Sequence, residues 1–415
     1  MISYSKALSL IEKNPIKLKN EKISIINSIN RVSAENIFSP NNNPLSNNAA
    51  FDGFAILSRE TKNLSKKKVK KFKILKTIAA GDNPKIKNYK KNSVVEVMTG
   101  GLIPKYYDSI LPVEKAKYYP SNNNPTHLIV SERIKKFSHV RFAGEDYKKK
   151  DIVLKKGELI QPKHLMAFTV LGIKEVKVKK KPKIIFYGTG NEIVDYNKKK
   201  VLSWQVRNSN NHYFTSFGKT LHYQIIDGGL IKDREKKKLK EKLKKTFKSD
   251  IDIFVTSGAI SAGKFDFIPK IISELDFKMY FKGVYIKPGR PIMLSKFKRK
   301  EKLFFGLPGN PISCAAGFRF FIYPLIRNSL GMLKEKKFKA KLVNKYSKRK
   351  NFTHFARCLI NINSKGTGEL QILQKQQSHR IESFVKANCW GIFPSGKKQF
   401  KPGDIIEWVP LIPSS

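Results

Sequence analysis

One stretch of the chain, residues 250–313, constrains the fold more than any other. It begins with a short apolar run at 251–255, rich in β-branched and aromatic residues, which is typical of a buried strand. A turn rich in serine and glycine follows, and then a predicted helix over 265–275. A second strand is predicted at 303–305. The stretch therefore contains two junctions in which a strand leads through a loop into a helix.

The loops of both junctions are suited to binding an anion. The second loop, GLPGNP, ends with Asn310, a good N-cap residue, and Pro311, which suits the first position of a helix. Such junctions present free N–H groups and the positive ends of helices. A single glycine-rich turn needs no explanation beyond tight chain reversal. Two such turns with the sequence KPGR between them predict a site for a group such as phosphate.

The region before this stretch alternates between strand and helix patterns. Residues 183–187 resemble a strand, 208–218 a helix and 221–226 a strand. An amphipathic helix is predicted at 232–247, with Leu239, Leu243 and Phe247 on one stripe. This rhythm predicts a doubly wound, mostly parallel α/β sheet, whose ligands bind beyond the carboxyl ends of the strands. Three loops meet there, namely Gly188-Thr189-Gly190, Ser257-Gly258 and Gly306 to Pro311.

The other parts of the chain have different patterns, and we predict four domains. A helix at 4–12 and an apolar segment at 23–37 indicate a small helical unit, to which a helix at 162–171 returns. Two turn-rich linkers enclose a mostly β region. Short strand candidates at 352–362, 369–374, 383–385, 388–393 and 404–409 fit a small β-barrel or sandwich. The predicted domains are a discontinuous N-terminal helical domain (1–44 plus 141–176), an inserted mostly β domain (45–140), the α/β domain (177–332) and the C-terminal β domain (337–415).

The net charge of +51 raises the question of nucleic-acid binding. However, the lysines occur in short runs along the whole chain, and no recognisable nucleic-acid motif accompanies them. We therefore interpret most of the charge as a solvated surface and expect no specific nucleic-acid partner. The three cysteines form no CxxC pair, and no stretch is long and apolar enough for a membrane span. These features favour a cytoplasmic protein without a membrane partner.

Three acidic residues are candidates for chemistry. Glu192 follows the GTGN loop, Asp266 follows the SGAISAG loop, and Asp52 lies in AAFDGFAI. A carboxylate beside a phosphate site is repulsive unless a cation lies between them, so Glu192 and Asp266 together predict a Mg²⁺ site. Each residue also has a structural interpretation, since Asp266 can cap its helix and Asp52 can serve a turn before Gly53.

Basic and hydroxyl side chains complete the candidates. Lys287 and Arg290 lie on the KPGR turn and are suited to clamping an oxyanion. Arg141 and Arg357 would have to reach the site from other domains. A loop of the last domain carries Ser378 and His379. These residue types also occur in serine hydrolases, but the chain has no nucleophile elbow, so we reject that interpretation.

Seven motifs occur in one order along nearly the whole chain: AAFDGFAI, EVMTGGLIP, RFAGED, GTGNEI, VTSGAISAGKFDF, IKPGRP and GLPGNPIS. In this combination the chain resembles the molybdopterin molybdenumtransferases, the bacterial MoeA family, and is similar to the E domain of gephyrin. The resemblance implies a transferase of molybdenum cofactor biosynthesis that inserts molybdate into adenylated molybdopterin and releases AMP with Mg²⁺. It also implies a homodimer of four-domain subunits, with the active site between domain 3 of one subunit and domain 2 of the other. Further partners implied are the adenylyltransferase of the pathway and the enzymes that accept the cofactor.

The resemblance also assigns roles to residues. Catalytic roles fall to Asp52, Thr99, Glu192, Asp266 and Lys287, of which Glu192 and Asp266 are the metal candidates, and molybdate binding falls to Arg357 and Ser378. The remaining substrate-binding candidates are Gly188, Thr189, Asn208, Ser257, Gly258, Gly263, Arg290, Pro308, Gly309 and Asn310.

Two positions depart from the family pattern. Where the family has D-x-N, this chain reads Asn208-Ser209-Asn210, which keeps a hydrogen-bonding oxygen without the charge. Gly283 stands where the family commonly has a second lysine, and Lys282 is one residue earlier. Two other functions therefore stay open, a noncatalytic pterin-binding scaffold and a molybdopterin adenylyltransferase.

Overall fold

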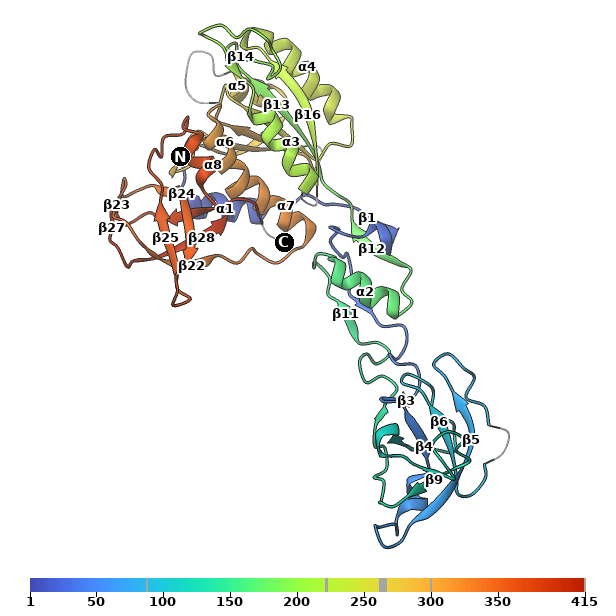
Figure 1. The fold of residues 1–415 in the computed structure, drawn as a ribbon. Helices are drawn as coiled ribbons and strands as arrows, with labels where there is room; N and C mark the ends of the chain where they lie inside the picture. The colour runs from blue at the N-terminus through green and yellow to red at the C-terminus, as the bar shows by residue number, and fades with distance from the viewer. Residues whose placement is uncertain (87–88, 221–222, 261–266, 299–300, 414–415) are drawn as a thin grey trace. The chain divides into compact units, whose positions relative to one another are not determined.

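The computed structural model describes residues 1–86, 89–220, 223–260, 267–298 and 301–413. The chain forms two compact units (Figure 1). The main unit comprises residues 1–35, 156–161 and 177–415, and the second unit comprises residues 36–155 and 162–176. The finer division into four domains stays a prediction.

A six-stranded sheet in the order β16-β13-β17-β21-β20-β18 organises the main unit. The first four strands are parallel, and β20 pairs antiparallel with both β21 and β18, so that β18 again runs in the direction of the first four. Every residue of β17 and β21 is buried, as expected for parallel strands covered on both faces. The strands are β13 (Lys183–Thr189), β16 (Gln224–Ile231), β17 (Ile253–Ser257), β18 (Phe277–Lys282), β20 (Met293–Phe297) and β21 (Leu303–Leu307).

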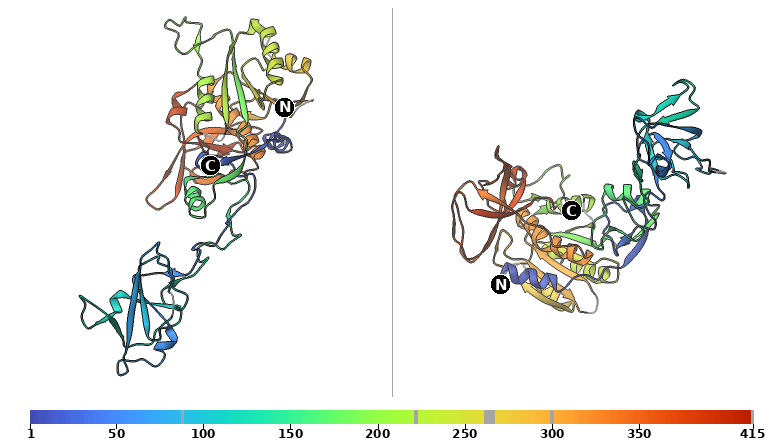
Figure 2. Two further views of the ribbon diagram at one scale, coloured as in Figure 1. Left: turned by 90° about the vertical axis from the view of Figure 1, so that its right-hand side faces the viewer. Right: turned by 90° about the horizontal axis from the view of Figure 1, so that it is seen from below.

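Helices cover both faces of this sheet (Figures 1 and 2). One face packs against α3, α6 and α7, and the other against α4 and α5. Leu239 and Leu243 of α4 are fully buried, as the predicted stripe requires. The doubly wound fold is therefore confirmed. The helices are α3 (Asn210–Thr220), α4 (Lys236–Phe247), α5 (Ile268–Glu274), α6 (Pro311–Gly317) and α7 (Tyr323–Leu330), with a π-helical turn, η5 (Phe318–Ile322), between the last two.

The C-terminal part of the main unit is a closed five-stranded barrel. Its strands follow the order β24-β25-β22-β28-β26, and β26 pairs with β24 to close the ring. The predicted barrel is thus confirmed. The strands are β22 (Phe338–Leu342), β24 (Thr353–Ile362), β25 (Gly368–Ile372), β26 (Cys389–Phe393) and β28 (Ile405–Pro410), with β23 (Tyr346–Ser347) pairing β27 (Gln399–Phe400) beside them.

The first helix, α1 (Tyr4–Glu12), packs against α7 (Figure 2). Its Ala7 and Ile11 are fully buried in the core shared by the sheet and the barrel. The backbone N–H of Ile16 donates to the Oγ of Ser329 at 2.9 Å. The N-terminal residues are therefore part of the main core.

The second unit contains a six-stranded mixed sheet in the order β7-β4-β6-β5-β9-β8, as predicted for a mostly β region. The helix α2 (Pro162–Val170) packs against β11, which pairs with β2. The strands are β2 (Ile37–Phe38), β3 (Asn48–Ala49), β4 (Gly53–Ile56), β5 (Lys70–Ile78), β6 (Ser93–Val97), β7 (Ser109–Pro112), β8 (Lys117–Tyr119), β9 (His127–Val130), β10 (Val140–Arg141) and β11 (Ile152–Leu154), with 3₁₀ turns η2 (Ser58–Thr61) and η3 (Val113–Lys115).

Two predicted elements were wrong. The segment 23–37 is not helical but contains β1 (Asn20–Ser24), the turn η1 (Ile25–Asn27) and part of β2. Asn30 adopts a left-handed φ of 60°, and its N–H bonds to a distant carbonyl, that of Ile160, at 3.0 Å. Residues 383–385 belong to the helix α8 (Glu382–Lys386) and not to a strand, because the N–H groups of Phe384 and Val385 turn back onto the carbonyl of Ile381.

The three cysteines lie in the interior of the protein. Cys314, Cys358 and Cys389 are all free and buried. Within the ranges that the structure describes, no helix has both the length and the apolar character needed to cross a bilayer.

Candidate functional site

The carboxyl ends of β13 and β17 lie against each other through side-chain and backbone contacts. The Oγ1 of Thr189 donates to the carbonyl of Ser257 at 2.8 Å. Gly258 follows with a φ of +95°, and its N–H donates to the carbonyl of Leu307 at 2.8 Å. A Cβ at position 258 would lie 2.7 Å from the carbonyl oxygen of Thr189. Only glycine fits this turn, which leaves bare backbone at the crevice.

The GLPGNP loop joins the same crevice. The carbonyl of Gly309 accepts a hydrogen bond from the Nδ2 of Asn210 at 2.9 Å. Asn310 is the N-cap residue of α6, as predicted, but its side chain makes no cap hydrogen bond. Its Nδ2 donates instead to the Oγ of Ser378 at 3.0 Å. The loop therefore connects the sheet to the barrel.

The GTGNE loop follows β13, and the start of α3 contacts the GLPGNP loop through Asn210. Gly190 has a φ of +147°, and a Cβ there would lie 2.7 Å from a carboxylate oxygen of Glu192. Asn208 is buried, and its Oδ1 accepts from the N–H of Asn211 at 3.3 Å, which helps to cap the helix. Gly188 is buried, and a Cβ at this position would lie 2.7 Å from the Oδ1 of Asn211, so no side chain fits there.

A cleft of about 800 Å³ lies beside the KPGR turn. It brings together five of the predicted residues, namely Lys287, Arg290, Pro308, Asn310 and Ser378, and adds others from the barrel. The turn is tied directly to the barrel strand β24, because β19 (Ile286–Lys287) pairs with it in parallel and aligns Lys287 with His354. The predicted anion clamp therefore faces the barrel.

The charges that line this cleft are all positive. The lining cations are Lys287, Arg290, Lys348, Arg349 and Lys398, and no carboxylate is among the described lining residues. Lys348 is only 5% exposed, and burial lowers the pKa of its ammonium. Such a cleft favours an anion that donates nothing and accepts many hydrogen bonds.

His354 lies among these cations. It is 4% exposed, and its Nδ1 is 3.0 Å from the hydroxyl of Tyr346. Burial, with Lys287 and Lys348 nearby, lowers the pKa of His354 from 6.5 to about 4. The imidazole is therefore neutral at pH 7.

This shift predicts a pH dependence of stability. Between pH 6.5 and about pH 4 the unfolded state binds the proton of His354 and the folded state does not. The contribution of neutral His354 to the unfolding free energy is thus complete above pH 6.5, the pKa of the unfolded state, and is lost as the pH falls towards 4. Between pH 7 and pH 5 the unfolding free energy of the parent should fall by about 2 kcal/mol more than that of His354→Gln. Denaturant unfolding at the two pH values tests this, and equal losses in both proteins would contradict it.

Arg357 does not line the cleft but supports the loop that does. It is 1% exposed, and its guanidinium donates to the carbonyls of Lys375 and Gln377 at 2.9 and 3.2 Å. Burial lowers the pKa of Arg357 to about 10. The residue after these carbonyls is Ser378, so Arg357 shapes the loop that carries it. The neighbouring His379 is exposed.

In the second unit, Asp52 and Thr99, both assigned to the active site by the resemblance, are hydrogen-bonded to each other. The Oδ1 of Asp52 accepts from the N–H and the hydroxyl of Thr99 at 2.6 and 2.7 Å. These two hydrogen bonds lower the pKa of Asp52, and both residues are exposed. Arg141 is also exposed, at the end of β10. The structure thus presents an ionised carboxylate on this unit.

Two predicted residues, Gly263 and Asp266, lie outside the described residues. Among the residues that are described, no group of three His, Cys, Asp or Glu side chains could hold a metal ion. The structure therefore does not test the predicted pairing of Glu192 with Asp266.

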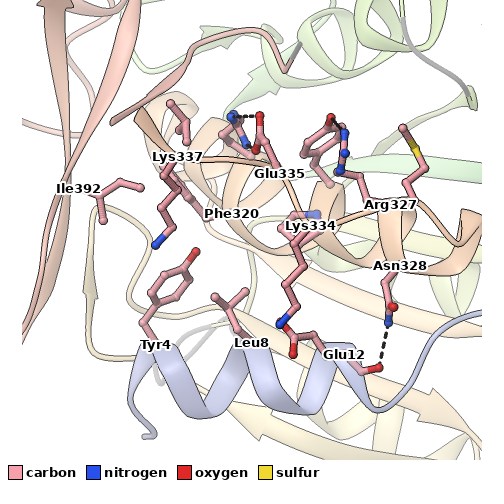
Figure 3. A pocket seen from close by; sticks show the side chains of 15 residues that line it. Tyr4, Leu8, Glu12, Phe320, Arg327, Asn328, Lys334, Glu335, Lys337 and Ile392 are labelled. Atoms are coloured by element: carbon pink, nitrogen blue, oxygen red, sulfur yellow. Dashed lines mark hydrogen bonds and ion pairs between the residues drawn. The ribbon is translucent and has the colours of Figure 1, made fainter. Parts of the chain in front are cut away.

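A smaller hollow of about 160 Å³ lies between α1, α7 and the barrel (Figure 3). Three of its lining cations pair with carboxylates. Arg319 makes two hydrogen bonds of 2.8 Å to Glu335, Lys334 pairs with Glu12 at 2.9 Å, and Lys337 pairs with Glu407 at 2.8 Å. The lining Arg327 donates to neutral groups, namely the carbonyl of Leu333 and the hydroxyl of Tyr323. These contacts hold α1 and α7 beside the barrel.

The sequence reasoning missed the barrel side of the cleft, namely Tyr346, Lys348, Arg349, His354 and Lys398. A signal was present in the basic run KYSKRKNFTH just before β24. Similar runs occur throughout the chain, so only the pairing of β24 with β19 distinguishes this one.

These features define an α/β protein with a basic cleft between the KPGR turn and a C-terminal barrel. Three family models match the chain: the MoeA N-terminal region (domains I and II) at 2–172, a probable molybdopterin-binding domain at 186–328, and the MoeA C-terminal region (domain IV) at 339–411. The chain belongs to the MoeA family, the molybdopterin molybdenumtransferases.

Individual relatives match over almost their full length. The molybdopterin molybdenumtransferase of Haemophilus influenzae is 31% identical over 99% of both chains. That of Staphylococcus epidermidis is 27% identical over 98% of this chain and 94% of its own. A solved MoeA protein from Pyrococcus horikoshii has a TM-score of 0.84 and 26% identity, with 99% of each chain covered.

Proposed function

We propose that this protein inserts molybdate into adenylated molybdopterin and releases AMP and molybdenum cofactor. The observation that carries the proposal is the cleft lined by Lys287, Asn310 and Ser378, in which the described lining residues include no carboxylate. Molybdate is a tetrahedral dianion that only accepts hydrogen bonds, so ammonium, amide and hydroxyl donors suit it. Membership in the MoeA family supports the same reaction.

In the proposed reaction, different residues of the chain bind the organic substrate, bind the oxyanion and position the binding loop. Gly258 and Gly309 let a phosphate-bearing substrate approach the backbone at the crevice, where a Cβ on Gly309 would lie 3.7 Å from Gly258. Lys287 and Ser378 hold the oxyanion, and Arg357 holds the loop of Ser378 in position. Fixing both substrates in one crevice lowers the entropy cost of their reaction.

Mg²⁺ fits this arrangement through Glu192. Its carboxylate lies against Gly190, where any side chain would displace it. Mg²⁺ in proteins commonly takes one or two carboxylates and completes its shell with substrate phosphates and water. Glu192, with Asp266 as the second carboxylate, would hold the ion, which when bound would offset negative charge on the leaving AMP.

A second copy of the chain completes the proposed site. The Asp52–Thr99 pair is exposed on the second unit, and its carboxylate is ionised without a cation among the described residues. In a homodimer, this carboxylate would be supplied to the crevice of the partner copy.

The deciding experiment measures AMP release from adenylated molybdopterin with the purified protein and Mg²⁺, with and without molybdate. Molybdate-dependent release with a molybdenum-bearing pterin product establishes the transferase. Binding without release would identify a noncatalytic scaffold instead. Consumption of ATP with unmodified molybdopterin would identify an adenylyltransferase, a reaction that leaves the barrel side of the cleft unexplained.

Asn208 gives a separate prediction. A carboxylate there would lie at the N-terminal end of α3, where it interacts favourably with the helix dipole. We expect Asn208→Asp to raise the unfolding free energy by about 0.5 kcal/mol and to lower the Mg²⁺ concentration needed for half-maximal activity. Mg²⁺ titration of AMP release tests this, with the exposed Asn122→Asp as a charge-matched control. Identical Mg²⁺ curves for Asn208→Asp and the parent would show that position 208 is remote from the metal.

A further inference from the structure

On the barrel side of the cleft, one buried cation is held only by neutral groups and one buried ring nitrogen has no partner among the described residues. The ammonium of Lys348 donates to the carbonyls of Phe352 and Arg349 at 2.7 and 3.4 Å, and no carboxylate pairs with it within the described part of the chain. The Nε2 of His354 is buried and has no hydrogen-bond partner there. A buried cation and a buried imidazole nitrogen are both costly to leave unsatisfied, which indicates a missing acceptor.

The two groups belong to one cluster of donors on the cleft wall. The N–H of Lys348 bonds to the carbonyl of Lys398 at 2.9 Å, because β23 pairs with β27. Arg349 follows Lys348 directly, and all four side chains line the cleft. This cluster comes from the barrel alone and contains none of the residues predicted from the sequence.

The cleft has room for more than one oxyanion. Its volume of about 800 Å³ far exceeds the space of a single tetrahedral anion. The donors also fall into two groups, which are held in position by different contacts. Asn310 and Ser378 are held together by their own hydrogen bond near Lys287, whereas Lys348 and His354 are held by the β23–β27 pair and by Tyr346.

We propose that Lys348 and His354, with Arg349 and Lys398, form a second oxyanion subsite that takes a phosphate group of the organic substrate. The subsite is separate from the molybdate position at Lys287 and Ser378, and the inference rests on the proposed function. If Tyr346 donates to Nδ1 of His354, then Nε2 carries the proton and donates to a phosphate oxygen. Lysine and arginine supply the remaining charge-assisted hydrogen bonds.

The adenylated substrate carries phosphate on its nucleotide side and on its pterin side, and both present the same chemistry. Calorimetric titration with AMP and with glycerol 3-phosphate, a phosphate monoester without a nucleoside, separates these sources. Tighter binding of AMP assigns the subsite to the nucleotide phosphate. Equal affinities assign it to the phosphate of the pterin side.

The test titrates the full-length protein with AMP, in the absence and presence of saturating molybdate. We expect both ligands to bind together. We expect Lys348→Met to bind AMP at least about tenfold more weakly, and to retain its molybdate affinity. Lys341→Met removes one exposed charge elsewhere on the barrel and controls for the general attraction of anions to this basic protein; its affinities should equal those of the parent.

A second variant keeps the test decisive, because Lys348 is buried and its replacement could disturb the barrel. Lys398 is exposed, so Lys398→Gln should fold normally and bind AMP about threefold more weakly. Displacement of AMP by molybdate in the parent protein, or parental AMP affinity in both variants, would overturn the second subsite. Neither result would affect the transferase itself, which is decided by molybdate-dependent AMP release.

Discussion

Asp52→Asn is expected to lower the rate of molybdate-dependent AMP release at least about a hundredfold, the usual contribution of a positioned acid–base group. Asparagine is isosteric with aspartate and keeps the oxygen that accepts both hydrogen bonds from Thr99. The second unit should therefore keep its fold while the charge is lost. Steady-state kinetics measures the loss of AMP release, and a thermal melt checks that the fold is kept. Thr99→Ser keeps both donors and serves as the conservative control.

The same variant tests whether two copies share each site. If one copy supplies Asp52 and the other supplies Lys287, a mixed dimer of Asp52→Asn and Lys287→Met contains one intact site. Random mixing makes about half of the dimers mixed and so restores about a quarter of the parental activity. No recovery on mixing would place both residues in the same copy, or would remove Asp52 from the site.

Arg357→Met is expected to cost about 3 kcal/mol of unfolding free energy and to weaken molybdate binding strongly. The guanidinium is buried and donates to two carbonyls of the loop before Ser378, and methionine can satisfy neither. The loop should then lose the conformation that places the hydroxyl of Ser378 beside Asn310.

Trp390 provides the probe for this experiment, because it is buried directly opposite Arg357 in the β24–β26 ladder. Denaturant unfolding followed by tryptophan fluorescence measures stability, and calorimetry measures molybdate affinity. Arg380→Met removes an exposed arginine from the same loop and should change neither quantity. Parental stability and affinity in Arg357→Met would show that the loop keeps its shape without the guanidinium.

The α/β core was predictable because its signals are local. The apolar runs of β17 and β21 are continuous, and glycine or proline marks the ends of the strands. The rule that ligands bind at the carboxyl ends of parallel strands then predicts that the loops of Thr189, Ser257 and Gly309 lie together. The family resemblance adds Asp52 and Thr99 as site residues, and this assignment stays a prediction.

The barrel side of the cleft was not predictable for a physical reason. The lysines and arginine of the cleft wall lie in the basic run KYSKRK at 345–350 and at Lys398, and similar basic runs occur along the whole chain. Lys348 and His354 become part of a site only because β19 pairs with β24, a contact between segments distant in sequence. Composition alone did not distinguish a buried lysine from the many that are exposed.

The position of α1 has a consequence for how the protein is made. The helix is synthesised well before α7, yet its buried residues pack against α7, and Ile16 bonds to a residue 313 positions later. At synthesis rates of about 5–20 residues per second, that partner appears roughly 15–60 s afterwards. For this period the apolar stripe of α1 is exposed. The core therefore closes late in translation, and a nascent chain halted before residue 329 would present this helix to chaperones or to other chains.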